Sequence, residues 1–266
     1  MLKRFLGASL VLVGGLVLTS VAHATTISVD LSKNGLNGGE GNKGTSLVPL
    51  DTGSSSAPFT ITAETMVDMT LPFSPEPGSD TGTIYIKDGA GVQDINGDGS
   101  KEISGGGALQ NEDLVFSLDS PILMSAFMVD LVKLDGITGD PLFNKDSPVL
   151  FVSASSTPGM WDWLITEAEL ASIIDMDGSG KLGTIDFGLI TSGLDCTTAL
   201  AACAVVSALD PTTIAIDAFK FRETQGHVAV SGVTVDLEAT VPEPTALLLL
   251  AGGLAALTGA RRKFRS

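Results

Sequence analysis

The feature that most constrains the fold is a series of short runs in which apolar and polar residues alternate. Alternation with a period of two is typical of strands, and these runs are rich in β-branched and aromatic residues. Segments of Gly, Asn, Asp, Ser and Pro between them favour turns. The pattern predicts an all-β protein, a β-sandwich of jelly-roll type. The runs are Thr26–Leu31, Pro58–Thr62, Thr83–Lys87, Asp113–Leu118, Ile122–Leu134, Val149–Ser153, Thr184–Ile190, Thr213–Arg222 and His227–Glu238.

One segment between these runs has a helical pattern instead. Thr166 is followed by Glu169 at the spacing of a capping box. Leu170, Ile173 and Ile174 form an apolar face at helical spacing. We therefore expect one short helix in an otherwise all-β domain.

The N-terminal residues 1–24 have the parts of a secretory signal peptide in the usual order. Lys3 and Arg4 are basic, an apolar stretch follows, and residues 22–24 read Ala-His-Ala, a site for signal peptidase. We expect cleavage after Ala24 and export of the chain. An uncleaved membrane anchor is the alternative, although the apolar run is short for a span.

The charge of the chain is very uneven. The sequence has 15 basic and 31 acidic residues, and six of the basic ones lie in the two terminal clusters Lys3–Arg4 and Arg261–Arg265. Residues 25–244 therefore carry 31 acids and 9 bases, a net charge of −22. Such a surface repels nucleic acid and attracts divalent cations, so we expect no nucleic-acid partner.

The two cysteines are Cys196 and Cys203. In an oxidising compartment such a pair is expected to form a disulfide. Seven residues of helix rise about 10.5 Å, which is beyond the reach of a disulfide. The segment between the cysteines is therefore not one straight helix if they are bonded; two free thiols on a short helix are the alternative.

An acidic segment after the expected helix, Asp175–Asp186, has the spacing of a twelve-residue calcium loop and resembles an EF-hand. Gly180 stands where such a loop turns sharply. Position 12 is an Asp in place of the usual Glu, so we expect a weak Ca²⁺ site; a turn without an ion is the alternative. The positions that would supply oxygen ligands are Asp175, Asp177, Ser179, Lys181 through its carbonyl, and Asp186.

A second acidic turn offers an incomplete version of the same spacing. Asp94, Asn96 and Asp98 alternate, and Glu102 falls at position 9, but Gly105 falls at position 12. These residues are a second candidate Ca²⁺ site, and a hairpin turn without an ion is equally compatible with them.

Support for catalysis is slight. The one histidine after the signal peptide, His227, lies in an alternating strand and has no nucleophile elbow with it. Trp161 and Trp163 are two residues apart, so on a strand they would share a face that stacks sugar rings, or else pack over the helix that follows. We expect no enzyme; a secreted hydrolase acting on polysaccharide, or a sugar-binding module, is the alternative.

The C-terminal residues 241–266 have three parts in a specific order. Val241, Pro242, Glu243 and Pro244 form a polar break, residues 245–260 carry no charge, and a basic cluster ends the chain. This order resembles the PEP-CTERM sorting signal of Gram-negative bacteria. The resemblance implies a transmembrane helix with its basic end in the cytoplasm, recognition by an exosortase, and processing near Pro242–Pro244.

The sequence thus predicts a signal peptide at 1–24, a β-sandwich domain at 25–240 and a sorting signal at 241–266. The expected protein is held at the inner membrane during export and then lies at the cell surface or in the extracellular matrix. Its expected role is structural or adhesive, with calcium ordering its acidic loops. Signal peptidase and an exosortase are its expected partners during export, and extracellular polysaccharide is its expected partner afterwards.

Overall fold

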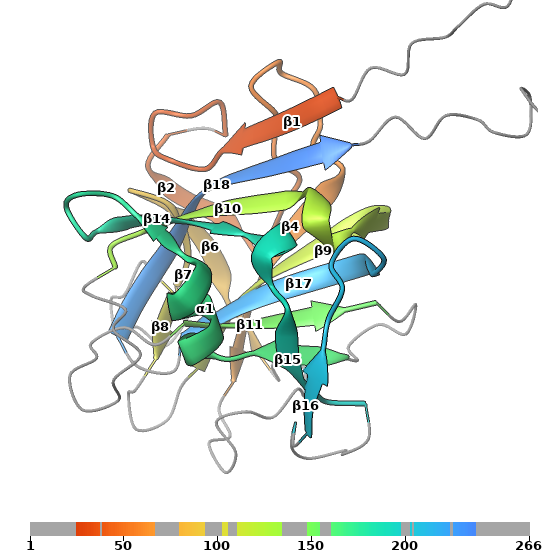
Figure 1. Ribbon diagram of the computed structural model, residues 1–266. Helices are drawn as coiled ribbons and strands as arrows, with labels where there is room; N and C mark the ends of the chain where they lie inside the picture. The colour runs from red at the N-terminus through yellow and green to blue at the C-terminus, as the bar shows by residue number, and fades with distance from the viewer. Residues whose placement is uncertain are drawn as a thin grey trace, which may run out of the picture. The chain divides into compact units, whose positions relative to one another are not determined.

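The chain folds into two antiparallel sheets that share one core (Figure 1). The computed structural model describes residues 25–37, 39–66, 80–93, 103–105, 111–134, 148–154, 161–197, 203, 205–223 and 226–237. Thr26–Leu237 form one compact unit. The predicted all-β architecture is confirmed; the signal peptide and the C-terminal transmembrane helix lie outside the described residues. No helix in the described ranges is long and apolar enough to cross a membrane.

The first sheet contains the strands that later form the candidate site. Its main path runs β13-β14-β10-β18-β7-β6-β2, and β1 and β8 both pair with β18. The strands are β1 (Thr25–Asp30), β2 (Gly41–Gly44), β6 (Thr83–Ile86), β7 (Ala90–Gln93), β8 (Ile103–Gly105), β10 (Phe127–Val132), β13 (Asp175–Met176), β14 (Leu182–Asp186) and β18 (Gly226–Leu237).

The second sheet packs its inner face against the first. Its main path runs β16-β15-β12-β11-β17-β9-β4-β3, and β5 pairs with β4. The strands are β3 (Ser46–Leu47), β4 (Phe59–Met66), β5 (Asp80–Thr81), β9 (Asn111–Leu123), β11 (Pro148–Ser153), β12 (Trp163–Ile165), β15 (Ser192–Asp195), β16 (Val205–Ala208) and β17 (Ala215–Glu223).

Phenylalanine rings join the two sheets at the centre of the core. The ring of Phe219 on β17 stacks on Phe116 of β9, with 4.6 Å between centroids. It also meets the edge of Phe127 on β10 at 5.4 Å, across the space between the sheets. Buried aromatic pairs of this geometry each contribute about 0.5–1.5 kcal/mol beyond their burial. The contact between Phe219 on β17 and Phe127 on β10 therefore helps to hold the two layers together.

One predicted strand is divided in the structure. The apolar run Ile122–Leu134 was expected to be continuous, but a 3-10 helix, η1 (Met124–Ala126), separates the end of β9 from β10. β9 belongs to the second sheet and β10 to the first. The sequence stays apolar through η1 because Met124 is fully buried where the chain passes from one sheet to the other.

The predicted helix is confirmed as α1 (Glu167–Ile173). The Thr166 side chain accepts a hydrogen bond from the backbone N–H of Glu169 at 3.4 Å, as a capping residue does. Leu170 is fully buried and Ile173 packs against the core. A second 3-10 helix, η2 (Phe187–Leu189), follows β14.

Candidate functional site

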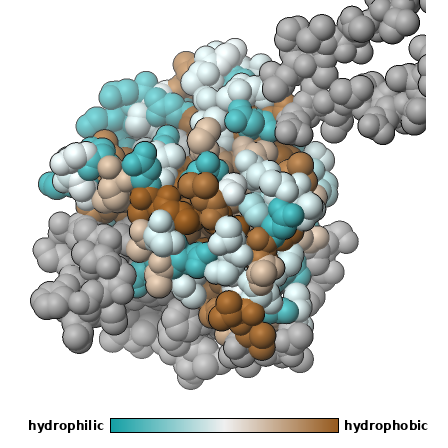
Figure 2. Space-filling view, viewed as in Figure 1, coloured by the Kyte–Doolittle hydropathy of each residue, from teal (hydrophilic) through white to brown (hydrophobic). Residues whose placement is uncertain are grey.

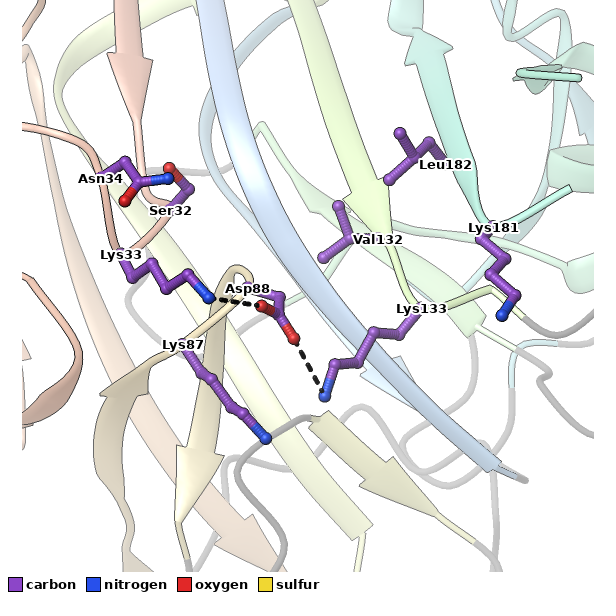
Figure 3. Close-up of a pocket in the computed structure, with 9 residues that line it drawn as sticks. All are labelled: Ser32, Lys33, Asn34, Lys87, Asp88, Val132, Lys133, Lys181 and Leu182. Carbon is purple, nitrogen blue, oxygen red and sulfur yellow. Dashed lines mark ion pairs between the residues drawn. The ribbon is translucent and has the colours of Figure 1, made fainter. Parts of the chain in front are cut away.

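A pocket of about 340 Å³ lies where four strands of the first sheet begin or end (Figure 3). Four lysines line it: Lys33, Lys87, Lys133 and Lys181. The described part of the chain contains seven lysines and arginines, of which Lys220 and Arg222 are buried. Four of the other five thus meet at one place on a strongly acidic protein.

Each of these lysines is placed by the end of a strand. Lys33 follows β1 in a short turn, Lys87 follows β6 directly, and Lys133 follows β10 directly. Lys181 stands immediately before β14, whose first residues pair with the end of β10. The four positions are far apart in sequence and each is a single lysine, so sequence reasoning did not find the pocket. The available signal was the repeated position of a lysine beside a strand end.

Backbone hydrogen bonds tie the segments of the pocket together. The N–H of Lys33 donates to the carbonyl of Lys87 at 3.0 Å, and the N–H of Leu134 donates to the carbonyl of Lys181 at 3.2 Å. The lysines therefore form two couples, one from β1 and β6 and one from β10 and β14. Each couple is carried by a bonded backbone, which keeps its two backbone positions close together.

Two local features turn the chain sharply at the pocket. Lys133 has a left-handed φ of 63°, a conformation that costs free energy in a residue with a Cβ. Such conformations are held in place by surrounding structure and are concentrated at functional sites. Gly89, beside the pocket, lies against β18 so closely that a Cβ would come within 2.8 Å of the Val230 carbonyl oxygen. The turn that carries Lys87 and Asp88 consequently requires glycine.

Among the described residues that line the pocket, Asp88 is the one with an acidic side chain. Its carboxylate lies between two of the lysines, 3.7 Å from the Nζ of Lys33 and 3.5 Å from the Nζ of Lys133. Lys87 and Lys181 form no ion pair with any described residue. The four ammonium groups and one carboxylate of the described lining residues sum to a charge of +3. The arrangement attracts anions at one point on an otherwise acidic surface.

The predicted calcium loop forms the hairpin of β13 and β14, in which Asp175 pairs with Thr184. Gly180 has a φ of 68° and makes the sharp turn expected of it. The Asp177 carboxylate accepts hydrogen bonds within its own turn, from the Ser179 hydroxyl at 2.7 Å and from the N–H groups of Lys181 and Leu182 at 3.3 Å. The hydrogen bond from Ser179 is the main cause that lowers the pKa of Asp177.

The other residues of this segment are spread along the hairpin. The Asp186 carboxylate lies at the far end of β14, where it accepts from the N–H of Gly188 at 2.8 Å. Within the described ranges, no three acidic, His or Cys side chains converge in a way that would hold a metal ion. Calcium at Asp175–Asp186 stays a prediction. The second candidate, with Asp94, Asn96, Asp98 and Glu102, lies outside the described residues.

The outer face of the second sheet contains a buried charged cluster. Asp113 on β9 accepts hydrogen bonds from Lys220 Nζ at 2.7 Å and from Arg222 Nε at 2.6 Å, and the three side chains are fully buried. The Lys220 ammonium also lies 4.9 Å from the ring centroid of Phe151 and 4.8 Å from that of Trp161. Cation–π contacts compensate part of the cost of burying the charge.

The pKa directions in this cluster follow from one carboxylate shared by two cations. Burial raises the pKa of Asp113, but the charges and hydrogen bonds of Lys220 and Arg222 lower it by more, so the pKa lies below its usual range. Burial is the main cause that lowers the pKa of Lys220; the charge of Asp113 opposes it and the charge of Arg222 adds to it.

The predicted disulfide between Cys196 and Cys203 is confirmed. It lies directly beyond the paired ends of β15 and β16, where Asp195 faces Val205. Cys196 is buried against Trp161 in the apolar cluster on the outer face of the second sheet. The cross-link therefore joins the ends of two paired strands at the edge of the sheet.

Of the two arrangements that the sequence left open for Trp161 and Trp163, the shared face is not formed. Trp161 precedes β12 and is buried in the outer cluster with Phe151, whereas Trp163 packs against the core between the sheets. The backbone of β12 begins only at Trp163, so the period of two does not extend to Trp161. The two indoles do not form a joint surface for stacking sugar rings.

The C-terminal tail matches a known family of sorting signals. The family model of the PEP-CTERM protein-sorting motif matches residues 240–263. The chain carries a PEP-CTERM sorting signal. The match includes Val241, Pro242, Glu243 and Pro244 and confirms the resemblance read from the sequence; it is consistent with an exported protein that an exosortase sorts. No curated protein and no solved structure matches the chain.

Proposed function

We propose that the mature protein is a non-catalytic adhesive component of the bacterial cell surface or extracellular matrix, and that it holds an anionic ligand in the lysine pocket. The observation that carries the proposal is the meeting of Lys33, Lys87, Lys133 and Lys181 in one pocket of an acidic chain. Gathering like charges costs free energy. A ligand that neutralises them accounts for the arrangement.

The sorting signal supports the location of this function. Signal peptidase would remove residues 1–24, and an exosortase would process the chain near Pro242–Pro244 after the apolar tail has held it in the inner membrane of a Gram-negative cell. Mass spectrometry of the protein from envelope and medium tests this directly. A chain that still ends at Ser266 would contradict the processing.

The jelly-roll type of the sandwich and the calcium sites are part of the same proposal. Passage of the chain from β9 in one sheet to β10 in the other and back to β11 supports a sandwich of jelly-roll type. The spacing of Asp175, Asp177 and Asp186 supports a weak calcium site. An ion there would compete with the hydrogen bonds that Asp177 accepts within its turn. This competition favours low affinity.

The adhesive role is tested by retention of the mature protein on matrix stripped from the producing cells. At about 0.15 M salt, where charges are screened beyond about 8 Å, we expect the wild type to be retained. The double variant Lys133→Gln/Lys181→Gln should be released into the wash. Lys43→Gln on β2 removes one lysine outside the pocket and should be retained like the wild type. Equal retention of all three proteins would overturn the assignment of the pocket.

A further inference from the structure

We propose that the ligand of the lysine pocket is an acidic polysaccharide, bound as a chain that spans the pocket rather than as a single small anion. This inference rests on the function proposed above and names its ligand class. Three features of the pocket support it: the central position of Asp88, the apolar surface beside the lysines, and the charge of the rest of the protein.

Asp88 excludes a small anion from the centre of the pocket. In Figure 3 its carboxylate lies between Lys33 and Lys133, the Lys87 side chain extends below it toward the end of Lys133, and Lys181 lies apart from the other three. A single phosphate held by all four lysines would have to stand against this carboxylate, and like charges repel strongly at such distances. The pocket instead suits anionic groups that meet the lysines on either side of Asp88 separately. The ligand therefore carries at least two negative groups with neutral material between them.

The surface beside Lys133 and Lys181 is apolar enough to contact such neutral material. Val132 and Leu182 line the pocket beside Lys133 and Lys181 (Figure 3), and the Leu182 side chain is 46% exposed. Exposed leucine offers contact to the C–H face of a sugar ring, and lysine stems add apolar surface while their ammonium groups stay in water. A chain of sugar rings that bears carboxylates supplies both kinds of contact.

The charge of the whole protein favours a polysaccharide over nucleic acid. Residues 25–244 carry a net charge of −22, which repels polyanions at long range. Double-stranded DNA carries one charge per about 1.7 Å of its axis, and its binding requires many basic contacts. A polyuronate carries its carboxylates at wider spacing, so it meets less repulsion outside the pocket. Two lysine couples suffice to neutralise the part of such a chain that the pocket covers.

The test compares anionic ligands that differ in length and in the spacing of their charges. The full-length protein in its mature form is titrated, in EDTA and at fixed ionic strength, with polygalacturonate, galacturonic acid, inorganic phosphate and double-stranded DNA. We expect binding of the polymer that exceeds binding of the monomer and of phosphate at equal anion concentration. Each lost lysine contact should weaken polymer affinity about 1.5- to 5-fold, so Lys133→Gln/Lys181→Gln should weaken it about 2- to 25-fold, with no change in Lys43→Gln.

The salt dependence gives a second measurement on the same proteins. The slope of log affinity against log salt scales with the number of charges neutralised, so losing one couple should reduce it by about half. If phosphate binding depends on the lysines and the polymer binds no more tightly than phosphate, the pocket is an anion site but its ligand is not a polysaccharide. DNA binding as tight as that of the polymer would overturn the ligand class. Polymer binding that is unchanged in Lys133→Gln/Lys181→Gln would overturn the pocket and the proposed function together.

Discussion

The ammonium of Lys220 on β17 donates a 2.7 Å hydrogen bond to the carboxylate of Asp113 on β9, and both side chains are fully buried. Asp113 is also held by the guanidinium of Arg222, through Nε at 2.6 Å. Adjacent strands of the second sheet are thus joined on the outer face by charges, while Phe116 and Phe219 join them on the inner face. Removing the carboxylate would leave two buried cations without their shared counter-ion.

We predict that Asp113→Asn lowers the free energy of unfolding by about 3–5 kcal/mol, the usual cost of breaking a buried ion pair by removing one partner. Urea unfolding followed by tryptophan fluorescence measures the change. Asp119→Asn, an exposed change on the same strand, is the matched control and should stay within about 0.5 kcal/mol of the wild type. Similar stability in the two variants would show that the cluster contributes little.

The lowered pKa of Asp113 also predicts how the free energy of unfolding changes at acid pH. The folded pKa lies below that of the unfolded chain, about 3.9, so the stabilisation is present above that pH and is lost as the pH falls through the folded pKa. The difference between wild type and Asp113→Asn should therefore be constant from neutral pH to about pH 5 and should shrink below pH 4. Unfolding curves at a series of pH values test this. A difference that grows on acidification has the wrong sign for this account.

Calcium is expected to raise the melting temperature of the mature protein. A ligand present at 100 times its dissociation constant stabilises by about 2.7 kcal/mol. Asp175→Ala should remove most of the rise, and it tests the site better than Asp177→Ala, because Asp177 also accepts the hydrogen bonds that form the turn. Asp119→Ala is the control. If neither calcium nor a chelator changes the melting temperature, the protein has no calcium site that stabilises it.

The disulfide between Cys196 and Cys203 is expected to stabilise the edge of the second sheet. Closing a ring of about eight residues stabilises by about 2–3 kcal/mol on the chain-entropy estimate. In Cys196→Ser/Cys203→Ser, hydrogen exchange should rise first in β15 and β16. Val205 and Val206 of β16 are 58% and 72% exposed, and Figure 2 shows a hydrophobic patch at the place of β16 in Figure 1. Mass spectrometry of exchanged peptides locates the change. Unchanged exchange at β16 would show that the strand pairing alone holds this edge.

Local chemistry made much of the fold predictable. The cap at Thr166, the turn at Gly180 and the disulfide depend on neighbouring residues, and the structure has each of them where the sequence places it. Strand β16 was not predicted, because Val205–Ala208 is too short to show alternation. Its strand conformation comes from pairing with β15 and from the cross-link beside it.

The lysine pocket was not predictable in the same way. Lys33, Lys87 and Lys133 each follow a strand, but only the order of strands in the sheet brings those strand ends together. The separation of Trp161 from Trp163 has a similar cause, because the position at which β12 begins is set by its pairing with β11. Long-range strand order, which the sequence pattern does not encode locally, decides the candidate site.

Acetylation footprinting tests the central claim most directly. The mature protein is labelled with an amine-reactive acetyl reagent, with and without polygalacturonate, and the modified peptides are quantified by mass spectrometry. The account predicts that the polymer protects Lys33, Lys87, Lys133 and Lys181, while labelling of Lys43 stays unchanged. Equal labelling of the four pocket lysines with and without the polymer, or equal protection of Lys43, would contradict it.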